Sequence, residues 1–95
     1  MPSLSVIVRN PSGLHARPAA TFVKAAATFT CDIRVTNLSR DAERSASAKS
    51  ILGVMQLGVA CGHELCMEAT GDDAEQALGE LRSLVEAGLG EEIPE

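Results

Sequence analysis

The chain has 95 residues, the size of one compact domain, so we expect a single domain over residues 1–95 with a core spanning about 4–90. Apolar residues make up 45% of the sequence and charged residues 22%, which favours a folded protein over a disordered one. The net charge of −5 argues against a protein that binds nucleic acid or an anionic membrane through its overall surface charge.

The charge is unevenly distributed along the chain. Residues 1–31 carry Arg9, Arg17 and Lys24 and no acidic residue, whereas residues 68–95 carry nine acidic residues against Arg82 alone. The basic first third therefore leaves room for a small anion site in an otherwise acidic protein.

The three cysteines, Cys31, Cys61 and Cys66, are odd in number and include no C-x-x-C pair. This pattern argues against a disulfide framework or a zinc site, fits a reducing cytosol, and leads us to expect no metal and no cofactor. The N-terminus lacks the pattern of a signal segment, and no apolar run approaches about 18 residues. We expect a soluble cytoplasmic protein without membrane insertion.

The first half of the chain predicts strand, helix and strand. Apolar and polar residues alternate over 4–9, and the Asn-Pro-Ser-Gly sequence at 10–13 ends that pattern. An Ala-rich stretch with helical spacing predicts a helix that begins at His15 or Ala16 and runs to about Phe29. Alternation returns over 31–38 and predicts a second strand.

The middle of the chain is less regular. The polar stretch 39–47 predicts a hairpin connection with a weak third strand. Residues 49–58 then read as a short apolar helix, with Ser50 as the N-cap and Gly58 just past the end.

The last third predicts a strand and a helix. Alternation over 63–70 predicts the strand, with His63 at its start as a surface residue. Asp72 and Glu75 resemble a capping box, and helical spacing then continues to Gly88. The whole order indicates an α+β fold with antiparallel strands and helices on one face.

The densest cluster of reactive residue types is Ser12-Gly13-Leu14-His15-Ala16-Arg17-Pro18. A histidine at a helix entry lies beside unpaired amides and the positive end of the helix dipole, which disfavour the imidazolium and suit an anion. A phosphoryl group on His15 could be held by the amides of Ala16 and Arg17 and by the Arg17 guanidinium. The alternative is that His15 merely caps the helix and Arg17 is a solvated charge.

Three stretches resemble the HPr family, the histidine phosphocarriers of the bacterial phosphoenolpyruvate:sugar phosphotransferase system. Residues 13–19 (GLHARPA) resemble its active-site motif and residues 49–55 (KSILGVM) its second motif, while residues 74–78 (AEQAL) are similar to its C-terminal helix. The resemblance covers about residues 4–92.

The resemblance implies an open-faced β-sandwich, a four-stranded antiparallel sheet with three helices packed on one face. It also implies that His15 takes a phosphoryl group on Nδ1 from phosphorylated enzyme I and passes it to the IIA component of a sugar permease. Arg17 would steady the group in transit, and the chain would act as a monomeric carrier rather than an enzyme.

Further residues have a functional and a structural interpretation. Ser12 supplies a phosphate-binding hydroxyl or is an ordinary turn residue, and Lys24 steers acidic partners. In the short helix, Ile51, Leu52 and Met55 form a docking patch or pack into the core. Ser50 resembles a serine that an HPr kinase phosphorylates in some family members, and it is otherwise only an N-cap.

One stretch departs from the family pattern. The connection over 37–48 is longer by about four residues and resembles that of HPr modules in fructose or dihydroxyacetone-kinase branches, which leaves the partner and the sugar open. A further alternative is a mainly regulatory protein that binds a partner when Ser50 is phosphorylated.

The acidic C-terminus suggests that Glu91, Glu92 or the terminal carboxylate lies near Arg17 until phosphate displaces it.

Overall fold

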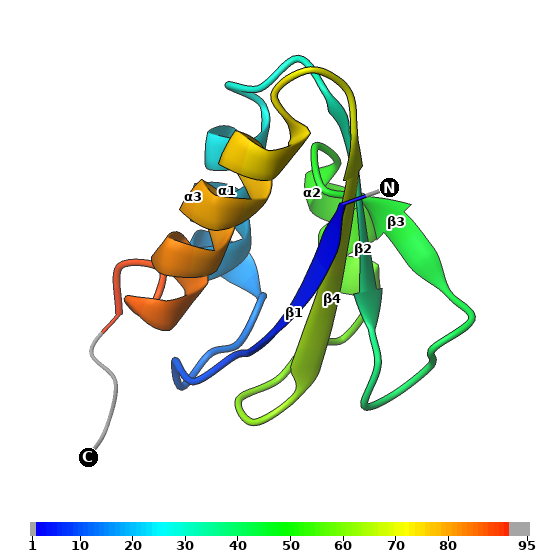
Figure 1. Ribbon diagram of the computed structural model, residues 1–95. Helices are drawn as coiled ribbons and strands as arrows, with labels where there is room; N and C mark the ends of the chain where they lie inside the picture. The colour runs from blue at the N-terminus through cyan, green and yellow to red at the C-terminus, as the bar shows by residue number, and fades with distance from the viewer. Residues whose placement is uncertain (1, 92–95) are drawn as a thin grey trace.

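The computed structural model describes residues 2–91, which form an antiparallel sheet with helices on one face and an open opposite face (Figure 1). This architecture confirms the expected open-faced α+β sandwich. No helix within these residues is both long and apolar enough to cross a membrane. In chain order the elements are β1 (Ser3–Ile7), α1 (Ala16–Ala26), β2 (Asp32–Asn37), β3 (Ser45–Ser47), α2 (Ile51–Gln56), β4 (Glu64–Thr70) and α3 (Ala74–Glu86).

The strands lie in the order β1-β4-β2-β3, so β4 is paired on both sides. In β4, Met67 lies opposite Leu4 of β1 and Val35 of β2. The alternation predicted for this strand is confirmed, because Leu65, Met67 and Ala69 are buried and the residues between them are partly exposed. The sheet therefore presents one apolar face to the helices and one polar face to solvent.

The core is aliphatic apart from two phenylalanines. Phe22 of α1 is fully buried, and Phe29, in the turn after that helix, is nearly so. Helix α1 ends at Ala26, earlier than the predicted Phe29, although Phe29 still packs into the core. From α3, the buried side chains are Ala74, Ala77, Leu78, Leu81 and Val85, which confirms its predicted apolar stripe.

The start of α3 differs from the prediction. The N-cap is Asp73 rather than Asp72, and the Asp73 side chain makes no capping hydrogen bond. Its carboxylate instead accepts bonds from Thr30 N (3.0 Å), Thr30 Oγ1 (3.3 Å) and Cys31 N (3.0 Å). The Thr30 amide, followed by the Cys31 thiol and amide, lowers the pKa of Asp73. This carboxylate therefore joins the α1–β2 connection to α3.

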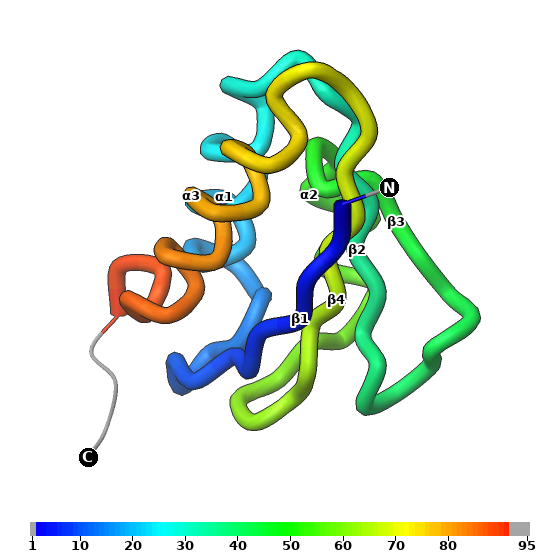
Figure 2. Tube along the Cα trace, in the orientation of Figure 1, coloured from blue at the N-terminus to red at the C-terminus, as the bar shows by residue number. Residues whose placement is uncertain are grey.

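Three loops meet at one end of the sheet, as Figure 2 shows. They are the loop after β1, the turn over 57–63 before β4, and the loop over 38–44 after β2. Leu14 N donates to Val59 O (2.9 Å) and Leu38 N donates to Glu64 O (2.9 Å), so the turn is bonded to the first loop and the base of β4 to the second. The residue predicted to carry the chemistry, His15, follows the first of these loops.

A paired substitution tests the packing of α3 against the sheet. Leu81→Ala removes a fully buried side chain, so we expect the free energy of unfolding to fall by about 2–5 kcal/mol. Leu52→Ala is the matched control, because Leu52 is 65% exposed, and we expect a change within about 0.5 kcal/mol. Urea unfolding measures both, and equal losses would contradict the assigned burial.

Candidate functional site

His15 occupies the N-cap of α1, which confirms the predicted start of this helix. Its backbone is extended (φ −131°, ψ 149°), and its side chain is exposed and makes no capping hydrogen bond to the helix. The capping role considered as an alternative is therefore not performed by the imidazole. The ring is left accessible to a partner at the positive end of a helix.

The first helical residue has an unusual backbone. Ala16 has φ 49°, in the left-handed region that costs a non-glycine residue roughly 1–2 kcal/mol. Such strain is typical of functional sites, where the surrounding structure holds it in place. Arg17 follows with an exposed side chain, so His15 and Arg17 both reach solvent from the same first turn.

The loop that leads to His15 is held tightly against the turn over 57–63. Gly13 has φ 60°, and a Cβ added there would overlap Val59 O and lie 2.7 Å from Ala60 Cα. Leu14, which is buried, donates its amide to Val59 O at 2.9 Å. Only glycine permits this backbone contact, which fixes the position of His15 two residues later.

A carboxylate from the far end of the chain binds the same loop. Glu91 Oε1 accepts from Asn10 Nδ2 (2.9 Å) and Ser12 N (3.1 Å), and Glu91 Oε2 accepts from Ser12 Oγ (2.9 Å). The Asn10 bond, then those from Ser12, lower the pKa of Glu91, and the charge of Arg17 adds a smaller effect.

Two predictions bear on this contact. The acidic tail does reach the loop beside Arg17, as expected for Glu91, while Glu92 and the terminal carboxylate lie outside the described residues. Ser12, considered as a phosphate ligand, instead donates both its amide and its hydroxyl to Glu91.

The segment after α3 is shaped to deliver Glu91. Gly88, Leu89 and Gly90 have φ values of 96°, 53° and 89°, so the chain turns sharply at three consecutive residues. Leu89 is buried in the core and donates its amide to Leu84 O (3.1 Å), and Glu91 N donates to Gly88 O (2.9 Å). Burial of Leu89 offsets the strain of its left-handed backbone and anchors the glutamate.

Asn10 is a site residue that sequence reasoning missed. It is fully buried, and its Nδ2 donates to Gly13 O (2.9 Å) as well as to Glu91. Its Oδ1 has no hydrogen-bond partner among the described residues. An Asn-Pro pair before Ser-Gly indicates a turn, but nothing in that pattern predicts a buried asparagine.

The prediction that His63 is a surface residue is wrong. The side chain is half-buried, and Nδ1 accepts from Ala60 N (3.0 Å) and lies 3.0 Å from Asn37 Nδ2. The Ala60 amide can only donate, so Nδ1 is the acceptor of that bond. The buried Asn37 also donates to Leu57 O (3.2 Å), so the two side chains brace the turn on which Leu14 rests.

The short helix α2 contributes the expected apolar surface only in part. Ile51 and Leu52 are 44% and 65% exposed, which favours the docking interpretation for both, whereas Met55 is half-buried and packs against the core. Ser50 is the N-cap as predicted, and its Oγ accepts from Gly53 N at 3.1 Å. Lys24 is exposed in the last turn of α1.

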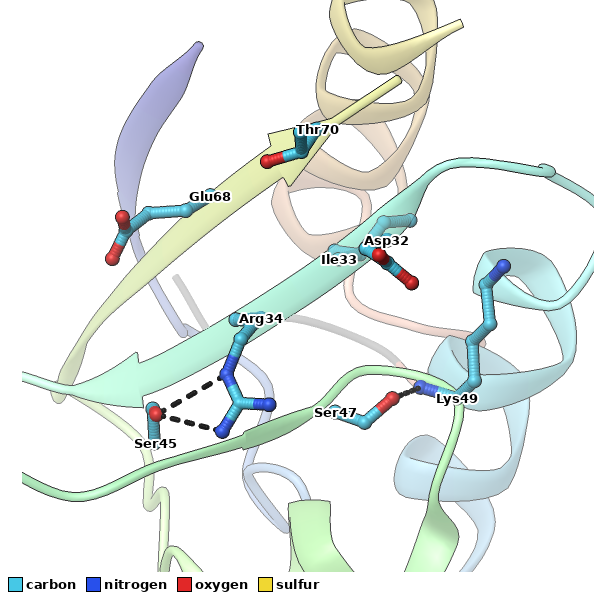
Figure 3. A pocket seen from close by; sticks show the side chains of 8 residues that line it. All are labelled: Asp32, Ile33, Arg34, Ser45, Ser47, Lys49, Glu68 and Thr70. Atoms are coloured by element: carbon cyan, nitrogen blue, oxygen red, sulfur yellow. Dashed lines mark hydrogen bonds between the residues drawn. The ribbon is translucent and has the colours of Figure 1, made fainter. Parts of the chain in front are cut away.

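A hollow of about 380 Å³ lies elsewhere, on the open face of the sheet (Figure 3). Arg34 donates to Ser45 Oγ there (3.4 and 3.1 Å), and Lys49 Nζ donates to Phe29 O (2.7 Å). Its two basic and two acidic side chains balance, and none of the residues predicted to bind phosphate lines it. The lining residues are Asp32, Ile33, Arg34, Ser45, Ser47, Lys49, Glu68 and Thr70.

The site is thus an accessible histidine at a helix entry, on the edge of an open-faced α+β sandwich. Residues 2–87 match the family model described as the PTS HPr component phosphorylation site. The chain therefore belongs to the HPr family of phosphocarriers of the phosphotransferase system.

Individual relatives agree with this assignment. The chain is 38% identical to the phosphocarrier protein HPr of Pseudomonas aeruginosa over 85 residues, which cover 90% of this chain and 91% of the relative. It is 44% identical to the multiphosphoryl transfer protein of Haemophilus influenzae over 86 residues, 90% of this chain and 17% of that relative. The chain thus spans about a fifth of the length of such multiphosphoryl relatives.

A solved structure is similar over nearly the whole fold. The crystal structure of HPr-C-His from Thermoanaerobacter tengcongensis matches with a TM-score of 0.89 at 41% identity, covering 98% of this chain and 100% of that one.

Two glycine substitutions test the contact that positions His15. Gly13→Ala adds both left-handed strain and an overlap with Val59 O, whereas Gly62→Ala adds strain alone, since nothing lies within 4 Å of its added Cβ. We expect Gly62→Ala to cost about 1–2 kcal/mol of unfolding free energy. We expect Gly13→Ala to cost about 1–3 kcal/mol more. Equal costs in thermal or urea unfolding would contradict the close contact.

The Glu91 contact predicts a specific pH dependence. Because the folded pKa of Glu91 is lowered, its stabilisation is complete above the ordinary value of 4.5 and is lost as pH falls through the lowered pKa. Wild-type protein should therefore be more stable than Glu91→Gln at neutral pH, and this advantage should shrink in acid. Urea midpoints of the wild type and Glu91→Gln across the acid range measure this advantage, with Glu80→Gln on the exposed surface of α3 as the control. A difference between wild type and Glu91→Gln that does not change with pH would refute the prediction.

Proposed function

We propose that His15 accepts a phosphoryl group on Nδ1 from phosphorylated enzyme I and passes it to the IIA component of a sugar permease. The observation that carries this proposal is the His15 ring itself, exposed at the N-cap of α1 and free of any capping role, with Arg17 in the same helical turn. The HPr family assignment supports the class of reaction.

In the proposed transfer, the Nδ1 lone pair of His15 forms a bond to phosphorus as the bond from phosphorus to the donor breaks. The ring keeps its Nε2 proton, and the phosphoryl oxygens face the first-turn amides and the Arg17 guanidinium. The same displacement in the opposite sense delivers the group to the acceptor. An exposed site suits this exchange, because both partners must reach the same atom.

Glu91 has a part in this proposal. In the unphosphorylated protein its carboxylate occupies the donors of Ser12 and Asn10. A phosphoryl group beside Arg17 brings further negative charge, which repels the carboxylate and competes for the cation. Displacement of Glu91 then releases the Ser12 amide and hydroxyl as extra phosphate donors.

The partner surface in this proposal combines apolar and basic residues. Ile51 and Leu52 supply exposed apolar area, and Lys24 steers acidic partners toward it. The long 37–48 connection keeps a fructose or dihydroxyacetone-kinase branch as the alternative. A regulatory role through an HPr kinase is favoured by one observation, the exposed Ser50 beside Ile51, where a phosphate would place negative charge against the apolar patch.

Phosphorylation with phosphoenolpyruvate and purified enzyme I tests the site. Intact-mass measurement should show one added phosphate that is lost on acid treatment, and His15→Ala should add none. Arg82→Gln, on the exposed surface of α3, is the control and should be phosphorylated like the wild type. Acid-labile phosphate on His15→Ala would show that the acceptor is another residue.

A further inference from the structure

The loop between β2 and β3 has a defined shape although it is polar. Asn37 O accepts from Arg40 N (3.2 Å) and Asp41 N (3.0 Å), and Asp41 O accepts from Arg44 N (3.2 Å). The Asp41 side chain accepts from Glu43 N (3.1 Å), which closes a further turn. These bonds organise the loop over 38–44 in advance of any binding event.

The loop places two arginines at the C-terminal end of α2. Arg40 and Arg44 line a hollow of about 190 Å³ together with Asn37, Asp41, Gln56 and Leu57. The Arg40 guanidinium lies over Gly58, where an added Cβ would overlap its Nη1. The loop therefore folds back onto α2 rather than extending freely into solvent.

Among the residues that the structure describes, neither arginine has an acidic partner. The ion pair found within residues 2–91 is Arg82–Glu86 (3.4 Å), so neither Arg40 nor Arg44 is paired with a carboxylate in that part of the chain. Asp41 lines the same hollow, but its carboxylate already accepts the Glu43 amide. The lining of the hollow therefore carries two positive charges against one negative charge, and Glu43 of the same loop is not among its lining residues.

This hollow lies next to the apolar patch and is connected to the His15 loop through residues 57–59. Leu52 and Gln56 are one helical turn apart and so lie on the same face of α2. Leu52 is 65% exposed, and Gln56 lines the hollow. The chain then runs from Leu57 to Val59, whose carbonyl holds Leu14 beside His15, at the end of the sheet where the three loops meet (Figure 2).

We infer that the loop over 38–44 forms the second half of the docking surface, and that it fits a protein partner offering an apolar side chain to Leu52 and carboxylates to Arg40 and Arg44. This inference rests on the proposed carrier function. Charge supports an acidic partner, since residues 68–95 carry nine acidic residues against Arg82 and repel such a partner from that part of the surface. Attraction to the Arg40 and Arg44 guanidinium groups then orients the partner onto this hollow.

The test compares two double variants with the same change in charge. Arg40→Gln/Arg44→Gln removes the proposed contact, and Arg34→Gln/Arg82→Gln removes two arginines on the open sheet face and on α3. For phosphoryl transfer from phosphorylated enzyme I at low salt, we expect the first variant to raise KM roughly three- to tenfold with kcat unchanged. The control should stay within about twofold, and the difference should shrink as salt is added.

The outcomes separate the two levels of the proposal. If wild-type protein takes no phosphoryl group from enzyme I, the proposed function fails. If wild-type protein is phosphorylated but both double variants share one KM, or if only kcat falls, the docking inference alone is overturned. Sedimentation completes the test, because a dimer lost only in Arg40→Gln/Arg44→Gln would assign this face to a second copy of the chain and overturn the inference.

Discussion

The contact between Gly13 and the backbone of Val59 and Ala60 is the constraint on which the site depends. The two segments approach so closely that no side chain fits at Gly13, and the Leu14 amide is bonded to Val59 O. His15 therefore enters α1 from a fixed point. The turn that receives this contact is itself braced by Asn37, the last residue of β2, and by His63, the residue before β4, so both side chains help to fix the loop that leads to His15.

At this end of the molecule the positive charge of Arg17 lies near the carboxylate of Glu91. The Glu91 carboxylate accepts hydrogen bonds from the loop next to Arg17, from the Ser12 amide and the Asn10 side chain. A carboxylate and a phosphoryl group accept hydrogen bonds from the same kinds of donors, but the phosphoryl group carries more negative charge. A carrier needs such a balance, because it must accept the group and also release it.

His15, the proposed phosphoryl acceptor, lies on the surface rather than in a cavity. The hollow on the open sheet face is larger than that beside Arg40 and Arg44, yet its opposed charges give it no preference for an anion. His15 stands instead on an exposed helix entry, next to exposed apolar residues of α2. The proposed transfer between proteins would account for this placement, since a docked partner rather than a pocket would exclude water from the reaction.

The sequence by itself determined the local features: the alternation of β4, the start of α1 at His15, the Ser50 cap of α2 and the GLHARPA motif that carries the family. These depend on periodicity and on neighbours within a few residues. Tertiary structure alone decided that Glu91 binds Ser12, that Asp73 binds Thr30 rather than capping α3, and that His63 is held beside Asn37. The partners in these three contacts are separated by 79, 43 and 26 positions in the sequence, so they produce no periodic pattern from which they could be predicted. Only the folded sheet and helices bring these donors and acceptors together.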